Sequence, residues 1–129
     1  MTEASQVTAT SGSYIARHWR GELSLPKSYW INGAIIGVVC RIVFTALLTG
    51  LVIGASTMPW MALLFVLVVA VNVVVVIWQI VGIWRSAGNY TGPKVWAILA
   101  RIAAALAAIY LVYVEIQNFS VLADTLAGR

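Results

Sequence analysis

WMALLFVLVVAVNVVVVIWQIVGI, residues 60–83, is a run of 24 residues that contains no Asp, Glu, Lys or Arg. About 20 helical residues cross the roughly 30 Å hydrocarbon core of a bilayer, so the run is long enough to span it. Sixteen of its residues are Leu, Ile, Val or Phe, and at their usual transfer energies they favour insertion by roughly 5–10 kcal/mol. A β-strand is excluded despite the many valines, because an open sheet edge in lipid leaves backbone groups without partners. The run therefore predicts a transmembrane helix.

Two further apolar runs flank this one, at residues 31–53 and 95–116. Short segments that contain Gly and Pro, residues 54–59 and 88–93, separate the three runs. Such segments stop one helix and start the next. We therefore expect an all-α integral membrane protein with three transmembrane helices and a short outer tail, placed at 29–54, 58–87, 93–118 and 119–129.

The overall composition agrees with a membrane protein. Hydrophobic residues make up 62% of the 129-residue chain and charged residues only 9%, whereas soluble domains carry about 25% charged residues. A chain this short cannot bury such an excess of apolar side chains in one core. The composition therefore excludes an ordinary soluble enzyme, a disordered tail and a nucleic-acid-binding module, and no nucleic acid is expected as a partner.

The segment before the first run divides into two parts. Residues 1–13 are small and polar, which predicts a flexible tail. Residues 14–28 form a basic segment next to the membrane, in which Ile15, Trp19 and Leu23 recur every four residues. This spacing fits a short amphipathic helix in the headgroup region, with an irregular basic flank as the alternative.

Basic residues are distributed asymmetrically along the chain. Under the predicted topology five lie on the N-terminal side of the membrane, and only Arg129 lies on the other side. Because basic segments tend to stay in the cytoplasm, we expect a cytoplasmic N-terminus and a periplasmic or outside C-terminus in the inner (plasma) membrane of a bacterium. We expect lipid headgroups to contact the five residues, which are Arg17, Arg20, Lys27, Arg85 and Lys94.

Polar residues inside the predicted spans are costly unless they are paired, so they are the candidate functional residues. On the first span, Gly33, Gly37, Arg41 and Thr45 recur every four residues and share one helix face. The pair Gly33 and Gly37 lets a second backbone approach closely. The candidate set for helix packing or partner contact also includes residues of the other two spans, namely Asn72, Gln79 and Arg101.

Counting residues from the aromatic side chains at the cytoplasmic boundary gives a depth for each polar group. Arg41 and Asn72 come to about 16 and 18 Å, and Arg101 and Gln79 to about 8 Å each. We therefore predict two pairs, Arg41 with Asn72 and Arg101 with Gln79. Glu115 comes to about 28 Å, near the opposite interface.

The two arginines admit different roles. Arg101 is shallow enough to extend its guanidinium to the membrane surface. Arg41 is deeper, and three interpretations stay open for it: a buried arginine that fixes helix packing, a contact with another subunit, or part of a ligand pathway.

No catalytic set is visible in the sequence. The single His, His18, precedes the spans and is interpreted as a solvated residue of the basic flank. The single Cys, Cys40, lies alone in an apolar run, and Glu115 is the one carboxylate inside the spans. These residues supply no nucleophile–base pair and no ligand cluster, so we expect neither an enzyme nor a cofactor or metal site.

The expected function is that of a non-catalytic accessory or assembly subunit. It would pack through its small and polar helix faces against a larger inner-membrane complex or against copies of itself, with membrane lipids as its other partners. The alternative is a small channel or transporter for an anionic or polar solute, lined by Arg41, Arg101, Asn72 and Gln79.

Overall fold

The computed structural model describes residues 12–128, and within this part of the chain every regular element is a helix. In chain order the elements are α1 (Tyr14–Arg20), η1 (Lys27–Ile35), α2 (Ile36–Ala55), α3 (Met61–Gly88) and α4 (Lys94–Leu126). The predicted all-α fold class is confirmed. The flexible tail predicted for residues 1–13 lies outside the described residues, except for its last two positions.

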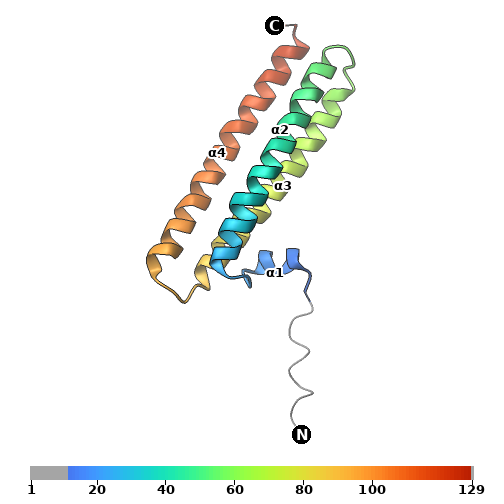
Figure 1. The fold of residues 1–129 in the computed structure, drawn as a ribbon. Helices are drawn as coiled ribbons and strands as arrows, with labels where there is room; N and C mark the ends of the chain where they lie inside the picture. Colours follow the sequence, from blue (N-terminus) through green and yellow to red (C-terminus); the bar gives the residue numbers. More distant parts are fainter. Residues whose placement is uncertain (1–11, 129) are drawn as a thin grey trace.

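Three helical rods are long and apolar enough to cross a membrane: Lys27–Ala55, Met61–Gly88 and Lys94–Leu126. The first rod is η1 continued directly by α2 (Figure 1). The rods lie side by side, and α3 packs against both α2 and α4. Their outward faces carry large apolar side chains, such as Leu63 at 75% and Ile109 at 68% exposure. Large exposed apolar surfaces of this kind mark faces that contact a membrane or another protein.

Helix α1 lies across one end of the bundle, where η1 begins and α3 ends (Figure 1). The C-terminus of α4 lies at the opposite end. Helix α1 packs mainly on α3, although the two elements are separated by the whole first rod in the sequence. Residues 14–20 are therefore part of the folded bundle.

The apolar core consists of two separate clusters. One lies at the α1 end and contains Ile83 of α3 together with Ala100 and Ala104 of α4. The other lies toward the far end and contains Phe65 of α3 and Leu122 of α4. Buried polar side chains occupy the stretch of α3 between the two clusters, and this stretch contains the candidate site.

Two elements differ from the sequence-based expectation. Helix α4 continues to Leu126, eight residues beyond the predicted end of the third span. No helix-breaking residue occurs before Gly128, and Leu122 is buried in the second core cluster, so the helix has both the sequence and the packing to continue. The first rod begins with nine residues of π-helix, Lys27–Ile35, in which the N–H of Ile36 still donates to the oxygen of Ile31.

Candidate functional site: the polar network under helix α1

Helix α1 is short, and both of its ends are capped. The Oγ atom of Ser13 accepts a hydrogen bond from the N–H of Ala16 at 3.3 Å. At the other end Gly21 adopts the left-handed conformation, with φ of 74°. The N–H of Gly21 then donates to the backbone oxygen of His18, and the N–H of Glu22 donates to the backbone oxygen of Arg17, both at 3.0 Å. This is a Schellman motif, which stops the helix and turns the chain back toward the bundle.

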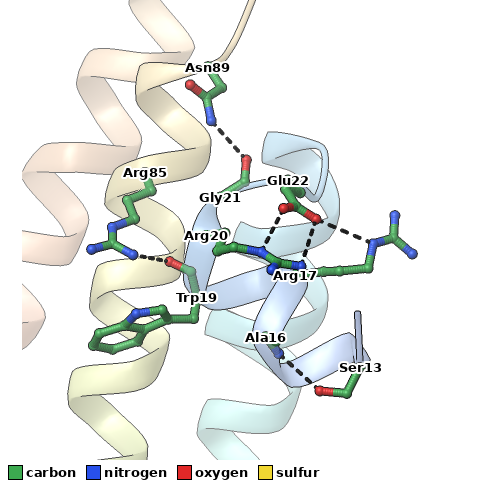
Figure 2. Close-up of polar contacts among 9 residues, drawn as sticks. All are labelled: Ser13, Ala16, Arg17, Trp19, Arg20, Gly21, Glu22, Arg85 and Asn89. Atoms are coloured by element: carbon green, nitrogen blue, oxygen red, sulfur yellow. Dashed lines mark hydrogen bonds and ion pairs between the residues drawn. The ribbon is translucent and has the colours of Figure 1, made fainter. Parts of the chain in front are cut away.

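Two side chains of α3 and that of its C-cap residue, Asn89, donate hydrogen bonds to backbone carbonyl oxygens of the α1 segment. Trp78 Nε1 bonds Ile15 at 3.0 Å. Arg85 bonds Trp19 at 2.8 Å, and Asn89 bonds Gly21 at 3.1 Å (Figure 2). The carbonyl groups of Trp19 and Gly21 lie at the C-terminal end of α1, where carbonyl groups have no partner within the helix, so the bonds from Arg85 and Asn89 satisfy groups that would otherwise be left open. The α1 segment is therefore held by its backbone and not only by side-chain packing.

Charged side chains around α1 pair with one another. One carboxylate oxygen of Glu22 accepts a hydrogen bond from Arg20 Nε at 2.7 Å, and the other oxygen lies 3.9 Å from Arg17 Nε (Figure 2). The Arg85 guanidinium also lies over the Trp19 ring, 5.1 Å from its centroid. The prediction that lipid headgroups contact the five basic residues stays a prediction. The structure adds that three of them, including Arg85, have partners within the chain.

His18 points from α1 into the bundle and is completely buried. Its Nδ1 atom lies 3.0 Å from the amide nitrogen of Asn32, and its ring lies 4.4 Å from the Trp78 ring. Its Nε2 atom faces Gly82 so closely that a Cβ atom there would come within 2.2 Å. The interpretation of His18 as a solvated residue is wrong. The helix buries its His18 side, while Ile15 and Trp19 remain exposed at 64% and 39%.

Asn32 is the centre of this network. Its side-chain oxygen accepts from the Tyr14 hydroxyl at 2.9 Å, and its amide nitrogen faces His18. Its backbone oxygen accepts from Gln79 Nε2 at 2.9 Å. Three helical elements, α1, η1 and α3, therefore meet at one asparagine. We refer to Tyr14, His18, Asn32, Trp78 and Gln79, with Gly82 beneath the imidazole, as the His18 network.

The sequence contained a signal for Asn32 that our candidate set missed. Asn32 is a buried amide near the start of a long apolar run, beside Gly33, and such a residue requires a partner at that depth. A neighbouring pair, Ser28 of η1 and Ser86 of α3, shares a buried hydrogen bond of 2.8 Å and was missed in the same way. The Ser28–Ser86 bond and the bond from Gln79 to the Asn32 backbone both join η1 to α3.

Burial is the main influence on the ionisation of His18. It lowers the pKa of the imidazole below its ordinary value, because the charged form would lose its hydration. The nearby backbone of Gln79 opposes this shift. However, Nε2 forms no well-aligned hydrogen bond within the described part of the chain. The Asn32 amide group donates to Nδ1, which also favours the neutral ring.

A second buried polar group joins α3 to α4. Asn72 donates to one carboxylate oxygen of Glu115 at 2.7 Å, and Asn118 donates to the other at 3.0 Å. Glu115 is only 9% exposed, so its carboxylate is packed between the helices rather than facing outward. Neither predicted pair, Arg41 with Asn72 or Arg101 with Gln79, forms a hydrogen bond in residues 12–128.

The depth count failed because it placed Trp84 and Trp96 at one level. In the structure the Arg101 guanidinium lies over the Trp84 ring at 5.6 Å, so Trp84 packs beside a residue five positions beyond Trp96 on α4. Five helical residues correspond to about 8 Å. With this correction Glu115 comes to about 20 Å, within one helical turn of the about 18 Å counted for Asn72.

The small residues of the first rod pack within the chain. A Cβ atom on Gly33 would lie 2.8 Å from Ile83, and one on Gly37 would lie 3.7 Å from Gln79. Arg41 differs, because its one described interaction is with the Tyr110 ring, 5.5 Å from the centroid. Thr45, one turn further, is exposed.

Comparison of the chain with models of protein families, with curated proteins and with solved structures found no match. Within residues 12–128 no three His, Cys, Asp or Glu side chains gather as metal ligands would. The functional argument therefore depends on the polar groups themselves.

The buried carboxylate predicts a specific stability effect. Asn72→Leu removes the donor to Glu115 Oε1 without leaving a large void, and we expect it to lower the free energy of unfolding by about 2 kcal/mol. The double variant Asn72→Leu, Glu115→Leu should recover part of this loss, because Asn72 and Glu115 are then both gone and only the half-buried Asn118 loses its acceptor. Denaturation of the purified protein in detergent micelles measures both effects. Equal losses in the single and double variants would contradict the pairing.

Proposed function

We propose that the chain is a small, non-catalytic, multi-pass membrane subunit that packs against another protein through the outer face of α2 around Arg41. One observation carries the proposal. Arg41 lies at the centre of the first rod, 14 residues from Lys27 and 14 from Ala55, which places it about 21 Å from either end. Within residues 12–128 it has no hydrogen bond or ion pair, only its contact with Tyr110.

An arginine in this position requires a partner. A guanidinium carries five N–H donors, and the group is not deprotonated in proteins. Leaving it in the hydrocarbon core costs roughly 2.5–3.5 kcal/mol by insertion scales. Extension to the membrane surface does not solve the problem, because the surface is further away than the side chain reaches. Protein–protein contact at this face removes the cost.

The remaining titratable groups support a structural role. His18 is enclosed by Asn32, Trp78 and Gly82, and Glu115 is held by two asparagines. Both groups are engaged in packing the helices, and neither has a nucleophile beside it in the described chain.

We further propose the orientation and location. The basic residues 17, 20, 27, 85 and 94 belong to α1, the start of η1, the end of α3 and the start of α4, all at one end of the bundle (Figure 1). By the positive-inside rule this end faces the cytoplasm, in the inner (plasma) membrane of a bacterial cell. The C-terminus then faces the periplasm or the outside.

The alternative, a small channel or transporter for an anionic or polar solute, has weaker support. Asn72 and Gln79 are bonded to Glu115 and to the Asn32 backbone rather than facing an open path. The described chain has a cavity of about 650 Å³ between η1 and α4, but its lining is mainly apolar and includes none of the four proposed pathway residues. Flux of anions through liposomes that contain only this protein would favour the alternative.

Arg41→Leu tests the proposal. We expect the variant to fold, because the substitution removes an unpaired charge, and to lose association with its partner by at least tenfold. Native gel electrophoresis of membranes solubilised in mild detergent measures the fraction of the chain in a complex. Arg20→Leu, which removes an exposed arginine outside the spans, is the matched control and should leave the complex intact. Unchanged association of Arg41→Leu would contradict the proposed role of this face.

A further inference from the structure

We infer that the Arg41 face binds a transmembrane helix of a different protein that carries an Asp or Glu near its midpoint. This inference rests on the proposed function and names the partner class for that face. The Arg41 face consists of Arg41, Thr45 and Thr49 on α2, with Tyr110 on α4 beside them. Both threonines are exposed, and neither hydroxyl forms a hydrogen bond within residues 12–128.

The chemistry of this face points to a carboxylate. A guanidinium presents parallel N–H donors that match the two oxygens of one carboxylate, and the pair is strongest where water is absent. An opposite charge at the same depth would neutralise Arg41 in the middle of the membrane, which a neutral acceptor such as a backbone carbonyl does not do. The two threonines lie one and two turns further along the same rod, and they add short hydroxyl groups that a polar helix can approach closely.

A second copy of this chain does not supply that carboxylate. The chain has four acidic residues. Glu3 and Glu22 precede the first rod, and Asp124 lies 14 residues beyond Tyr110, about 21 Å along α4. Glu115 is the one acidic residue near the right depth. It is buried, and both its oxygens already accept hydrogen bonds from Asn72 and Asn118.

Tyr110 holds the arginine in position for such a partner. Tyr110 is 58% exposed, and the central carbon of the Arg41 guanidinium lies over its ring, 5.5 Å from the centroid. A cation–π contact leaves the N–H donors in the plane of the guanidinium free.

The test uses synthetic transmembrane peptides in liposomes with the full chain. Three poly-leucine peptides differ only at their central residue, which is Glu, Gln or Leu. Energy transfer between the labelled chain and the labelled peptide measures binding. We expect the Glu peptide to bind at least tenfold more tightly than the Leu peptide, and the Gln peptide to lie well below the Glu peptide. Arg41→Leu should abolish the preference, Arg41→Lys should keep part of it, and Arg20→Leu should leave it unchanged.

Failure of this inference is distinguishable from failure of the proposed function. Equal binding of the three peptides by the wild-type chain, or a Glu preference that survives in Arg41→Leu, overturns the carboxylate partner. Energy transfer between two labelled copies of the chain that depends on Arg41 also overturns it, while the proposed function as a packing subunit survives. If, in addition, the complex seen on native gels does not depend on Arg41, both the inference and the proposed function are overturned. Circular dichroism of Arg41→Leu and Arg41→Lys confirms that both variants are helical.

Discussion

Gly21→Ala should release α1 from α3 and increase tryptic cleavage after Arg20 by about a hundredfold. Gly21 has φ of 74°, which costs about 1 kcal/mol for alanine. A Cβ atom there would also lie 2.5 Å from the Cβ of Arg85, 2.7 Å from its carbonyl carbon and 2.9 Å from the nitrogen of Ser86. These are atoms of the α3 backbone or directly attached to it, so they cannot rotate away. Overpacking of this kind adds about 1–3 kcal/mol.

The measurement is limited trypsin digestion of the protein in lipid nanodiscs, with the N-terminal fragment identified by mass. Gly50→Ala is the matched control, because a Cβ atom at Gly50 meets nothing within 4 Å. This control should leave the cleavage rate unchanged and slightly favour the helix, by up to about 1 kcal/mol. An equal cleavage rate in wild type and Gly21→Ala would mean that the contact of Gly21 with α3 does not hold α1.

The three long helices were predictable because span length and hydropathy are local properties of the sequence. An uninterrupted run such as residues 60–83 needs no information about its neighbours to be recognised as a helix. Helix ends were less predictable. The run that ends in Ile116 continues as helix to Leu126, because side chains such as Leu122 find apolar partners on α2 and α3 that the sequence alone does not locate.

The pairing of polar groups was not predictable, because it depends on how far one helix is shifted along another. The sequence indicated that Asn72 requires a partner, but the shift of α4 along α3 that brings Glu115 to Asn72 and Arg101 to Trp84 is set by the packing of the whole bundle. His18 was misinterpreted for a related reason. The face that α1 buries is selected by a glycine on α3, Gly82, which leaves space for the imidazole ring. That complementarity joins positions 64 residues apart.

Docking of α1 should weaken as the pH falls below about 6.5, the ordinary pKa of an undocked histidine. Burial lowers the pKa of His18 in the docked state, so the docked protein binds fewer protons than the undocked protein in this range. The equilibrium constant for docking of α1 is therefore largest above pH 6.5. It falls by up to tenfold for each pH unit below that value, until the pH reaches the lowered pKa.

Neighbouring charges do not reverse this sign. The cations of α1 are Arg17 and Arg20, which pair with Glu22. On α3 the nearest cation is Arg85, which bonds the Trp19 carbonyl, and on η1 it is Lys27, which is exposed. Within the described chain no carboxylate contacts His18, so an imidazolium there would be both buried and without a counterion.

The single histidine of the chain makes this prediction directly measurable. In protein that carries isotope-labelled histidine and no polyhistidine tag, the magnetic resonance titration reports His18 alone. We expect its pKa below the ordinary value in wild type and close to about 6.5 in Gly21→Ala, where α1 is released. Amide hydrogen exchange of residues 14–25 should rise on acidification in wild type relative to His18→Gln at the same pH. A wild-type titration at the ordinary value, or equal pH dependence of the two proteins, would refute the link between His18 and docking. Agreement of the titration with the exchange would show that one buried imidazole sets the strength with which α1 is held.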